Sequence, residues 1–232
     1  SCGFTCEHDI IDGKCQKCGT QIYAAVIGDT GFRSLSDARS ALKNGTAAGE
    51  IKLLCDVSGF SDISKDSTPY VIDLNGYTIS VSSYVNISGD GSTLTLKNGK
   101  LLSEGQYGVI LYSGASLILG ANMTVKGKDY AVYVNSGTNL TLSSDTVLQG
   151  GLYSGGGKKL ETYLPAENTI FVSCEVDADG IAVRPTEVNR ANSLLEISEN
   201  SSYQGNLAVM EHEHAYGNDG SCICGKAAAV IL

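Results

Sequence analysis

The chain has 232 residues, a formal net charge of −9 and a hydrophobic fraction of 42%. This length allows one domain with small appendages. The acidic balance excludes nucleic acid as a partner, because such binding needs Lys and Arg side chains against the phosphates. No apolar run reaches the roughly 18 residues of a candidate membrane span. The 28 Gly residues and many short β-branched runs favour an all-β chain with frequent turns.

A small metal-binding knuckle is predicted over residues 1–22. Its thiol and imidazole side chains are Cys6, His8, Cys15 and Cys18. Such ligands suit a tetrahedral Zn²⁺ ion, and a closed set of four is typical of a structural site. So short a segment has almost no core and needs a cross-link, such as a bound metal ion, to be ordered. Residues 13–19 resemble the knuckle of zinc-ribbon-like modules. The alternative is a disulfide, such as Cys2–Cys18 or Cys6–Cys15.

A capping helix is predicted over residues 34–44. Ser34 can act as its N-cap, and Leu35 and Leu42 belong to an apolar stripe at helical spacing. Asn44 and the Gly that follows it supply the signal that ends the helix. Because the end of a repeat solenoid exposes unpaired strand edges, we expect this helix to cover the N-terminal end of the repeats that follow.

Residues 23–206 are predicted to form a right-handed parallel β-helix with rungs of about 23 residues. Apolar residues recur at this spacing over several rungs. The recurring columns are Leu94, Leu117 and Leu140; Leu96, Leu119 and Leu142; and Ile79, Leu102, Val125 and Leu148. A single rung cannot bury its apolar face, but a stack of rungs about 4.8 Å apart can. We therefore expect each strand to pair with the same strand one rung on.

Two further columns concern turns and tyrosines. Asn75-Gly76 and Asn98-Gly99 share one column, and we expect their Gly residues to supply a positive φ. The other column consists of Tyr84, Tyr107, Tyr130 and Tyr153. Their shared parity with valines and leucines of the same strands favours an inward orientation. This leaves Tyr112 and Tyr133 as candidates for an exposed ligand-binding face.

After the last of these tyrosines the repeat becomes irregular. Residues 155–159 are expected to form a protruding loop, and Phe171 to resume the apolar columns. Asp177, Asp179 and Arg184 are the best candidates for catalysis on an acidic polysaccharide, because that chemistry needs clustered carboxylates, or carboxylates that bind calcium beside a basic residue. The two aspartates are expected to share a strand face. A turn with a local ion pair explains the same residues.

A second knuckle is predicted over residues 207–232, which also hold the start of a possible following unit. Its ligands are His212, His214, Cys222 and Cys224. Every His of the chain falls in one of the two knuckles, which favours zinc over disulfides because a disulfide has no use for imidazole. The remaining cysteines of the predicted β-helix, Cys55 and Cys174, are expected to be buried free thiols in strands. Since each knuckle precedes an Ala-Val-Ile segment, we expect the parent protein to repeat this unit.

The segments 35–42, 51–57 and 72–79 resemble pectin-lyase-like β-helix domains in large surface proteins of Gram-positive bacteria, and the likeness covers roughly residues 24–150. The resemblance implies an extracellular or cell-surface location. We expect a non-catalytic surface module with structural zinc sites, which serves in adhesion, binds a glycan or a host surface protein, or acts as a rigid spacer. The alternative is a polysaccharide lyase or glycoside hydrolase of the same fold.

Overall fold

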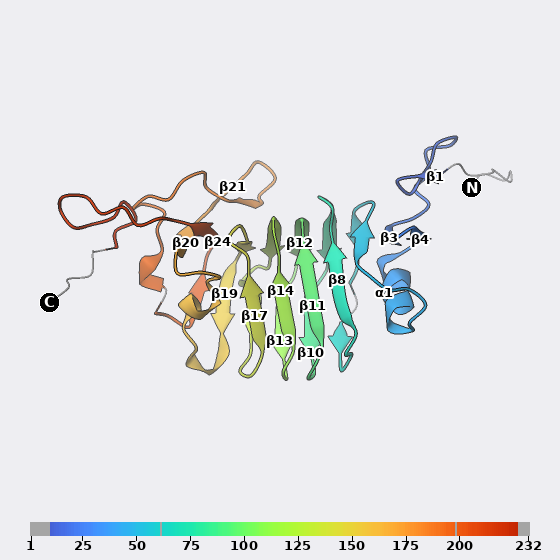
Figure 1. Cartoon of the computed structure of the whole chain (residues 1–232), viewed down its shortest axis with the longest axis horizontal. Coiled ribbons are helices and arrows are strands. Elements are labelled where there is room, and N and C mark those ends of the chain that lie inside the picture. Colours follow the sequence, from blue (N-terminus) through green and yellow to red (C-terminus); the bar gives the residue numbers. More distant parts are fainter. Residues whose placement is uncertain (1–9, 61, 198, 227–232) are drawn as a thin grey trace.

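The computed structural model describes residues 10–60, 62–197 and 199–226. Within these residues the chain is an all-β parallel solenoid, and equivalent residues such as Leu117 and Leu140 pair across neighbouring rungs, as the sequence predicts. Figure 1 shows the rungs stacked along the long axis, with the helix α1 (Leu35–Lys43) near one end.

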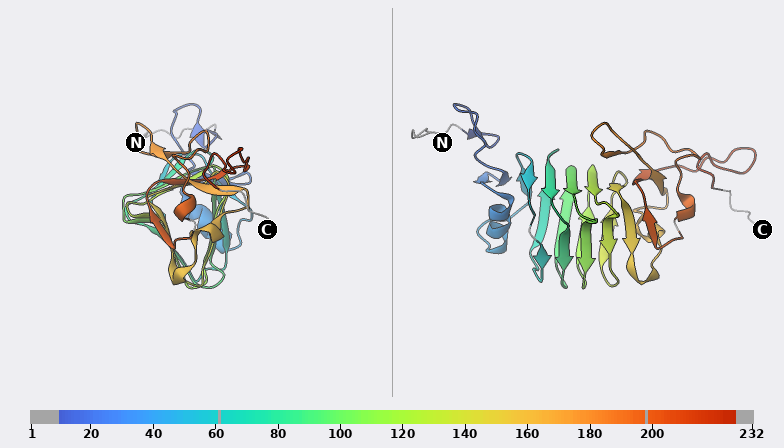
Figure 2. Two further views of the ribbon diagram at one scale, coloured as in Figure 1. Left: turned by 90° about the vertical axis from the view of Figure 1, so that its left-hand side faces the viewer. Right: turned by 180° about the vertical axis from the view of Figure 1, so that it is seen from behind.

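Three sheets form the walls of the solenoid (Figure 2). Sheet 1 has the strand order β17-β14-β11-β8-β5-β3-β4. Its strands are β3 (Ala25–Ile27), β4 (Thr30–Phe32), β5 (Ile51–Leu53), β8 (Pro69–Asp73), β11 (Thr93–Lys97), β14 (Ser116–Leu119) and β17 (Asn139–Leu142). Sheet 2 has the order β20-β24-β18-β15-β12-β9-β6. Its strands are β6 (Val57–Ser58), β9 (Thr78–Val81), β12 (Gly99–Ser103), β15 (Met123–Lys126), β18 (Val147–Gln149), β20 (Thr169–Ser173) and β24 (Leu207–Glu211).

Sheet 3 has the order β23-β19-β16-β13-β10-β7. Its strands are β7 (Ile63–Ser64), β10 (Val85–Ser88), β13 (Tyr107–Tyr112), β16 (Tyr130–Val134), β19 (Gly151–Ser154) and β23 (Ser202–Gln204). Two small hairpins lie outside the three sheets. They are β1 (Ile10–Ile11) with β2 (Lys14–Cys15), and β21 (Glu175–Val176) with β22 (Ala182–Val183). Short 3-10 helices are η1 (Gly155–Gly157), η2 (Leu160–Tyr163) and η3 (Leu195–Ile197).

The core is built from columns of paired aliphatic residues. Leu94 pairs with Leu117 and Leu117 with Leu140, and all three are buried, which confirms the predicted column. The next column is shifted, since Ile79 pairs with Leu101 and not with the Leu that follows it. The rung between these two residues is one residue shorter than the predicted period. Each fully buried Leu stabilises the fold by roughly 1.5–3 kcal/mol, so uninterrupted columns account for much of the solenoid's stability.

The corner between sheets 1 and 2 uses residues with positive φ. Asn75 and Gly76 have φ values of 52° and 88°, and Asn98 has 57°. Gly99 does not share this conformation, contrary to the sequence prediction, because it already belongs to β12. A Cβ atom at Gly99 would lie 2.4 Å from the Cβ atom of Leu74. Gly99 therefore permits a close backbone approach, whereas its Asn neighbour makes the turn.

The helix α1 covers the N-terminal end of the solenoid, as predicted. The Ser34 Oγ atom accepts a hydrogen bond of 3.0 Å from the Asp37 N–H and so caps the helix. The Arg39 guanidinium lies over the rings of Phe60 and Tyr70, at 4.6 and 4.8 Å from their centroids. This arrangement ties the helix to the first rungs. No helix among the described residues is long and apolar enough to cross a membrane.

The C-terminal end is closed by strands that reverse direction. The strand β24 pairs antiparallel with β18, β23 pairs antiparallel with β19, and η2 packs against β17. Phe171 in β20 is buried in the main core, as the predicted apolar column requires, but it pairs antiparallel with Val209 in β24 and so does not continue the parallel stack. Residues 155–157 form η1 rather than a plain loop. The reversal gives the last parallel strands of sheets 2 and 3 partners from the same chain, and η2 covers the last strand of sheet 1.

The predicted column of Tyr84, Tyr107, Tyr130 and Tyr153 lies outside the core, along sheet 3. Tyr84 is 42% exposed and Tyr107, Tyr130 and Tyr153 are half-buried, so the predicted inward orientation is wrong. Tyr107 begins its strand at a corner, where the alternation of inward and outward side chains has not yet started. Tyr153 pairs with Tyr133 rather than with Tyr130, since the rung from Tyr133 to Tyr153 is shorter than the predicted period.

Candidate metal centre

A cluster of metal-ligating side chains lies just beyond β24. His212 and His214 sit at alternate positions of the extended segment that follows this strand, so their side chains can meet on one side of it. The other two ligands, Cys222 and Cys224, come from a turn further along the chain. The ligand atoms of all four residues lie within 4.8 Å of one another. The sequence prediction had named the same four residues.

Two contacts define the cluster. The Nε2 atom of His212 lies 3.0 Å from the Sγ atom of Cys222, and the Nδ1 atom of His214 lies 3.4 Å from the Sγ atom of Cys224. The two imidazole rings meet nearly edge to face, with centroids 5.0 Å apart. Each thiol thus has an imidazole beside it, and the two pairs come together as one group of four.

A short turn presents the two sulfur atoms. The Cys222 N–H donates to the Lys226 carbonyl oxygen, and the Gly225 N–H donates to the Cys222 carbonyl oxygen, both at 2.8 Å. Gly225 has a φ of 94°, a conformation that favours glycine. Tyr216 forms a β-bridge with Cys222, and its ring stacks on that of His214 at 6.2 Å. The backbone therefore fixes both sulfurs without any long strand or helix.

The cluster rests on a second hydrophobic core, separate from the solenoid interior. Cys222 and Cys224 are each only 3% exposed. Their neighbours in this core are Val147, Ile170, Val172, Ala182, Ala208 and Met210. These residues come from β18, β20, β22 and β24. The site is consequently built where the antiparallel cap and the β21–β22 hairpin meet sheet 2.

The electrostatics of the cluster favour metal binding. Burial by itself raises the pKa of the Cys222 thiol, but hydrogen bonds from the backbone and side chain of Cys224 outweigh burial and lower that pKa. Burial lowers the pKa of His214, and nearby Lys226 lowers it further. Metal ligation requires thiolate and neutral imidazole, and these shifts favour both forms. Burial raises the pKa of Cys224, and a bound cation would act in the opposite direction.

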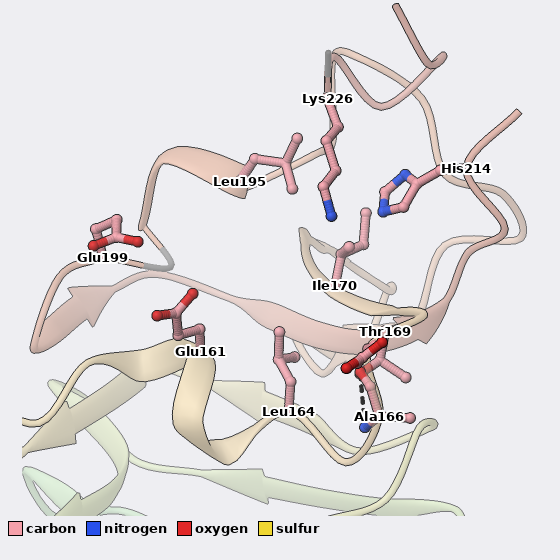
Figure 3. A pocket seen from close by; sticks show the side chains of 10 residues that line it. Glu161, Leu164, Ala166, Thr169, Ile170, Leu195, Glu199, His214 and Lys226 are labelled. Atoms are coloured by element: carbon pink, nitrogen blue, oxygen red, sulfur yellow. Dashed lines mark hydrogen bonds between the residues drawn. The ribbon is translucent and has the colours of Figure 1, made fainter. Parts of the chain in front are cut away.

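A cleft of about 750 Å³ opens beside the cluster. Figure 3 shows His214 and Lys226 above Ile170 and Leu164, with the carboxylates of Glu161 and Glu199 at the opposite side. The His214 Nε2 atom is buried and has no hydrogen-bond partner among the described residues. A ligating imidazole ordinarily donates its second N–H to an acceptor. His214 also lines the cleft, although its Nε2 atom itself is buried.

The N-terminal knuckle has a backbone turn that resembles the C-terminal one but is one residue longer. The Cys15 N–H donates to the Thr20 carbonyl oxygen at 2.9 Å, and the Gly19 N–H donates to the Cys15 carbonyl oxygen at 2.7 Å. The turn at Cys222 has two corresponding hydrogen bonds, but each spans one residue fewer, because Cys222 and Cys224 are one residue closer in the chain than Cys15 and Cys18. Figure 1 places the two turns at opposite ends of the solenoid, as expected from their order in the chain.

The ligand set of the N-terminal knuckle is only partly visible in the structure. Cys15 is buried in β2, and Cys18 is exposed in the turn that follows. The other two predicted ligands, Cys6 and His8, lie outside the described residues. A metal site at this end stays a prediction, supported by a Cys-containing turn of similar hydrogen-bond pattern.

The candidate catalytic residues do not converge. The Asp177 Oδ1 atom accepts hydrogen bonds of 2.9 Å from the backbone N–H groups of Asp179 and Ile181. Both aspartates therefore lie in the turn of the β21–β22 hairpin, and the expectation that they share a strand face is wrong. Arg184 lines a cleft beside Cys174, whereas Asp179 lines a different groove.

The cysteines outside the knuckles are half-buried and lie in connections rather than in strands. Cys55 falls between β5 and β6, and Cys174 falls between β20 and β21, so the prediction of buried strand positions is wrong. Both are free thiols, as predicted. Burial raises the pKa of Cys174 to about 12 and also raises that of Cys55. Neutral thiols are poor nucleophiles, which makes a reactive role for either residue unfavourable.

The two tyrosine candidates for ligand binding differ in exposure. Tyr112 is 42% exposed, whereas Tyr133 is half-buried and its ring stacks on that of Tyr153 with centroids 4.2 Å apart. The stack occupies a ring face that a sugar would need. Ligand binding at these tyrosines stays a prediction.

Comparisons of the chain with protein-family models, with curated proteins and with solved structures find no match. Function therefore has to be inferred from the fold and from the geometry of its sites.

Proposed function

We propose that this chain is a non-catalytic β-helix module of an extracellular or cell-surface protein, stabilised by structural zinc at its C-terminal Cys/His cluster. The observation that carries the proposal is the closed set formed by His212, His214, Cys222 and Cys224, whose ligand atoms lie within 4.8 Å of one another. Two thiolates and two imidazoles are a common ligand set of structural zinc. When bound, zinc supplies a cross-link between the two segments.

The distances fit such an ion. With zinc bonds of about 2.3 Å to sulfur and about 2.0–2.1 Å to nitrogen, neighbouring ligand atoms of a tetrahedron lie about 3.3–3.8 Å apart. The two nitrogen–sulfur contacts, at 3.0 and 3.4 Å, are close to this spacing. Small side-chain movements complete the tetrahedron.

The residues around the cluster fit a structural site that orders the C-terminal segment. Residues 212–226 contain almost no regular secondary structure, so few backbone hydrogen bonds order them. Four protein ligands leave no open position for a substrate or a reactive water molecule. Glu211 and Glu213, which alternate with the two imidazoles, are exposed. The ligands therefore clamp this segment onto the antiparallel cap.

The surface location and the pectin-lyase-like relationship belong to the same proposal. They are supported by the parallel β-helix and by the helix α1 that covers its first rungs. The separation of Asp177, Asp179 and Arg184 into a turn and two different clefts supports a non-catalytic role. A module of this kind serves as an adhesive or glycan-binding surface, or as a rigid spacer.

The test is elemental analysis of the purified native protein, together with a count of free thiols. We expect zinc in the native protein and one zinc ion fewer per chain in the double variant Cys222→Ser/Cys224→Ser. Cys55→Ser, which removes a thiol far from the cluster in the chain, should keep the native zinc content. A native protein without zinc whose knuckle cysteines are oxidised would sink the proposal.

A further inference from the structure

A groove runs across the outer face of sheet 2, away from the metal centre. Its floor follows one register column, in which Ser58 pairs with Ser80, Ser80 with Leu102, and Leu102 with Lys126. The groove has a volume of about 780 Å³. Since neighbouring strands of a sheet lie about 4.8 Å apart, the column extends about 14 Å. This is the length of a short linear oligosaccharide.

The β21–β22 hairpin closes one end of this groove. Gln149 is the next residue of the same column. Its Nε2 atom donates to the Gly180 carbonyl oxygen at 2.9 Å, and its Oε1 atom accepts from the Ala182 N–H at 3.0 Å. Figures 1 and 2 show the hairpin projecting from the C-terminal end back along the solenoid. The Lys126 Nζ atom donates to the same Gly180 carbonyl oxygen at 3.5 Å. These two side chains anchor the hairpin at the end of the column, where Asp179 adds a carboxylate to the lining.

The lining combines three kinds of groups. Its exposed hydroxyls are Ser58, Ser80 and Ser82; its charged groups are Glu104, Lys126, Lys128 and Asp179; its apolar groups are Val81, Leu102 and Ile181. The two ammonium groups balance the two carboxylates. A polyanion gains little from such a lining, and the net charge of −9 for the chain opposes it further.

We propose that this groove binds a linear, neutral oligosaccharide. Sugar hydroxyls donate to carboxylates and accept from ammonium and Ser hydroxyl groups, so each polar group of the lining has a matching partner. Among the apolar lining residues, the partly exposed Leu102 offers contact for the C–H face of a pyranose ring, whereas Val81 and Ile181 are largely buried. The assignment rests on the proposed function, because it treats the module as one that binds without cleaving. The proposed ligand site is therefore the groove and not the face that carries Tyr112 and Tyr133.

Two carboxylates from different elements give the groove its specificity. Glu104 follows β12, on the body of the solenoid, and Asp179 lies in the hairpin turn. An ionised carboxylate accepts strong hydrogen bonds from neighbouring hydroxyls. Removing the charge from either carboxylate should weaken binding by about tenfold or more. Gln149→Leu, which removes two hydrogen bonds to the hairpin, should weaken it as well.

The experiment is a titration of the isotope-labelled full chain, with its zinc content measured, against cellotriose, xylotriose, chitotriose, mannotriose and laminaritriose. We expect saturable changes in the amide signals of residues 80–82, 102–104 and 179–181 with at least one of these sugars. Glu104→Gln and Asp179→Asn should weaken that binding. The matched control Glu196→Gln, an exposed residue of η3, should leave it unchanged.

Each outcome separates this proposal from the proposed function. No change with any of the five sugars at millimolar concentration, or changes confined to other residues, overturns the groove assignment and leaves the zinc proposal standing. Binding at the groove by a chain that carries no zinc supports the assignment and removes the zinc proposal. Release of shorter sugars during the titration supports the ligand class and contradicts the non-catalytic role.

Discussion

The Nε2 atom of His212 lies 3.0 Å from the Sγ atom of Cys222, although ten residues separate them in the chain. This contact joins the extended segment that follows β24 to the turn that carries both cysteines. Because the intervening residues form little regular structure, the side-chain ligands are the main link between the two segments. The metal centre and the antiparallel cap should therefore respond together when the metal is removed.

Chelation of the metal should loosen the C-terminal segment without unfolding the solenoid. We expect amide hydrogen exchange to accelerate over residues 212–226, because the bound ion supplies most of the ordering free energy there. The strands β11 and β14 should keep their protection, since their columns are buried and independent of the ligands. Hydrogen exchange followed by mass spectrometry measures both regions in one sample. Equal acceleration in both regions, or none in the segment, would contradict the expectation.

Asp66 should give the protein an acid-sensitive increment of stability. Burial alone raises the pKa of this carboxyl, but hydrogen bonds from the Tyr70 hydroxyl, the Thr68 N–H and Lys43 outweigh it and lower the pKa to about 2. Because the folded pKa lies below the unfolded value, the stabilisation is present above about pH 4 and is lost as pH falls through about 2. We expect Asp66→Asn to cost about 2 kcal/mol at pH 7 and much less near pH 2.

Urea denaturation from pH 2 to 7 measures this effect. Asp90→Asn, at an exposed turn, is the matched control and should change the free energy of unfolding little at any pH. If Asp66→Asn followed the same pH profile as the native chain, the assigned hydrogen bonds would not be the source of the stabilisation.

The stacked rings of Tyr133 and Tyr153 should be energetically coupled. Their centroids are 4.2 Å apart and the ring planes differ by 10°, a geometry for which aromatic pairs contribute about 0.5–1.5 kcal/mol beyond burial. A double-mutant cycle with Tyr133→Ala and Tyr153→Ala should return a coupling free energy in this range. The pair Tyr112 and Tyr153 serves as a control and should be additive. Additivity of the stacked pair would show that the contact between the two rings contributes no coupling free energy.

Gly99→Ala should destabilise the protein by about 1–3 kcal/mol, the usual cost of overpacking. The new Cβ atom would lie 2.4 Å from the Leu74 Cβ atom and 2.5 Å from the Tyr77 carbonyl oxygen, neither of which can move freely. Gly120→Ala is the control, because its nearest neighbour is the Lys97 Cβ atom at 3.1 Å. Thermal denaturation of both variants decides the matter. A loss at Gly120 as large as that at Gly99 would mean that local sterics are not the cause.

The regular part of the fold is predictable because each rung repeats the same burial problem. Leu94, Leu117 and Leu140 recur at one spacing, and that spacing alone fixes their pairing. Where a rung changes length the same reasoning fails, as it does for Tyr153, which pairs with Tyr133 and not with Tyr130. The repeat period does not show which rungs have lost turn residues. Only the backbone hydrogen bonds show where a rung is shorter.

The candidate sites also differ in how far the sequence predicts them. The His-x-His and Cys-x-Cys spacings identify His212 and Cys222 as ligands because such residues have few other uses at that density. The packing of Cys222 in one core with Met210 depends on the antiparallel cap, which no repeat in the sequence predicts. The groove escapes sequence reasoning altogether, since the Gln149–Gly180 contact joins residues far apart in the chain whose types are ordinary.

The reversal of β24 against β18 also sets the length of the particle. A ladder of parallel strands is a template, and an open one can recruit equivalent strands from other chains, as fibrils do. Here the final strands of sheets 2 and 3 end on partners that run the opposite way. In these two sheets the parallel ladder thus stops within the chain, so a further copy cannot extend it in the same register.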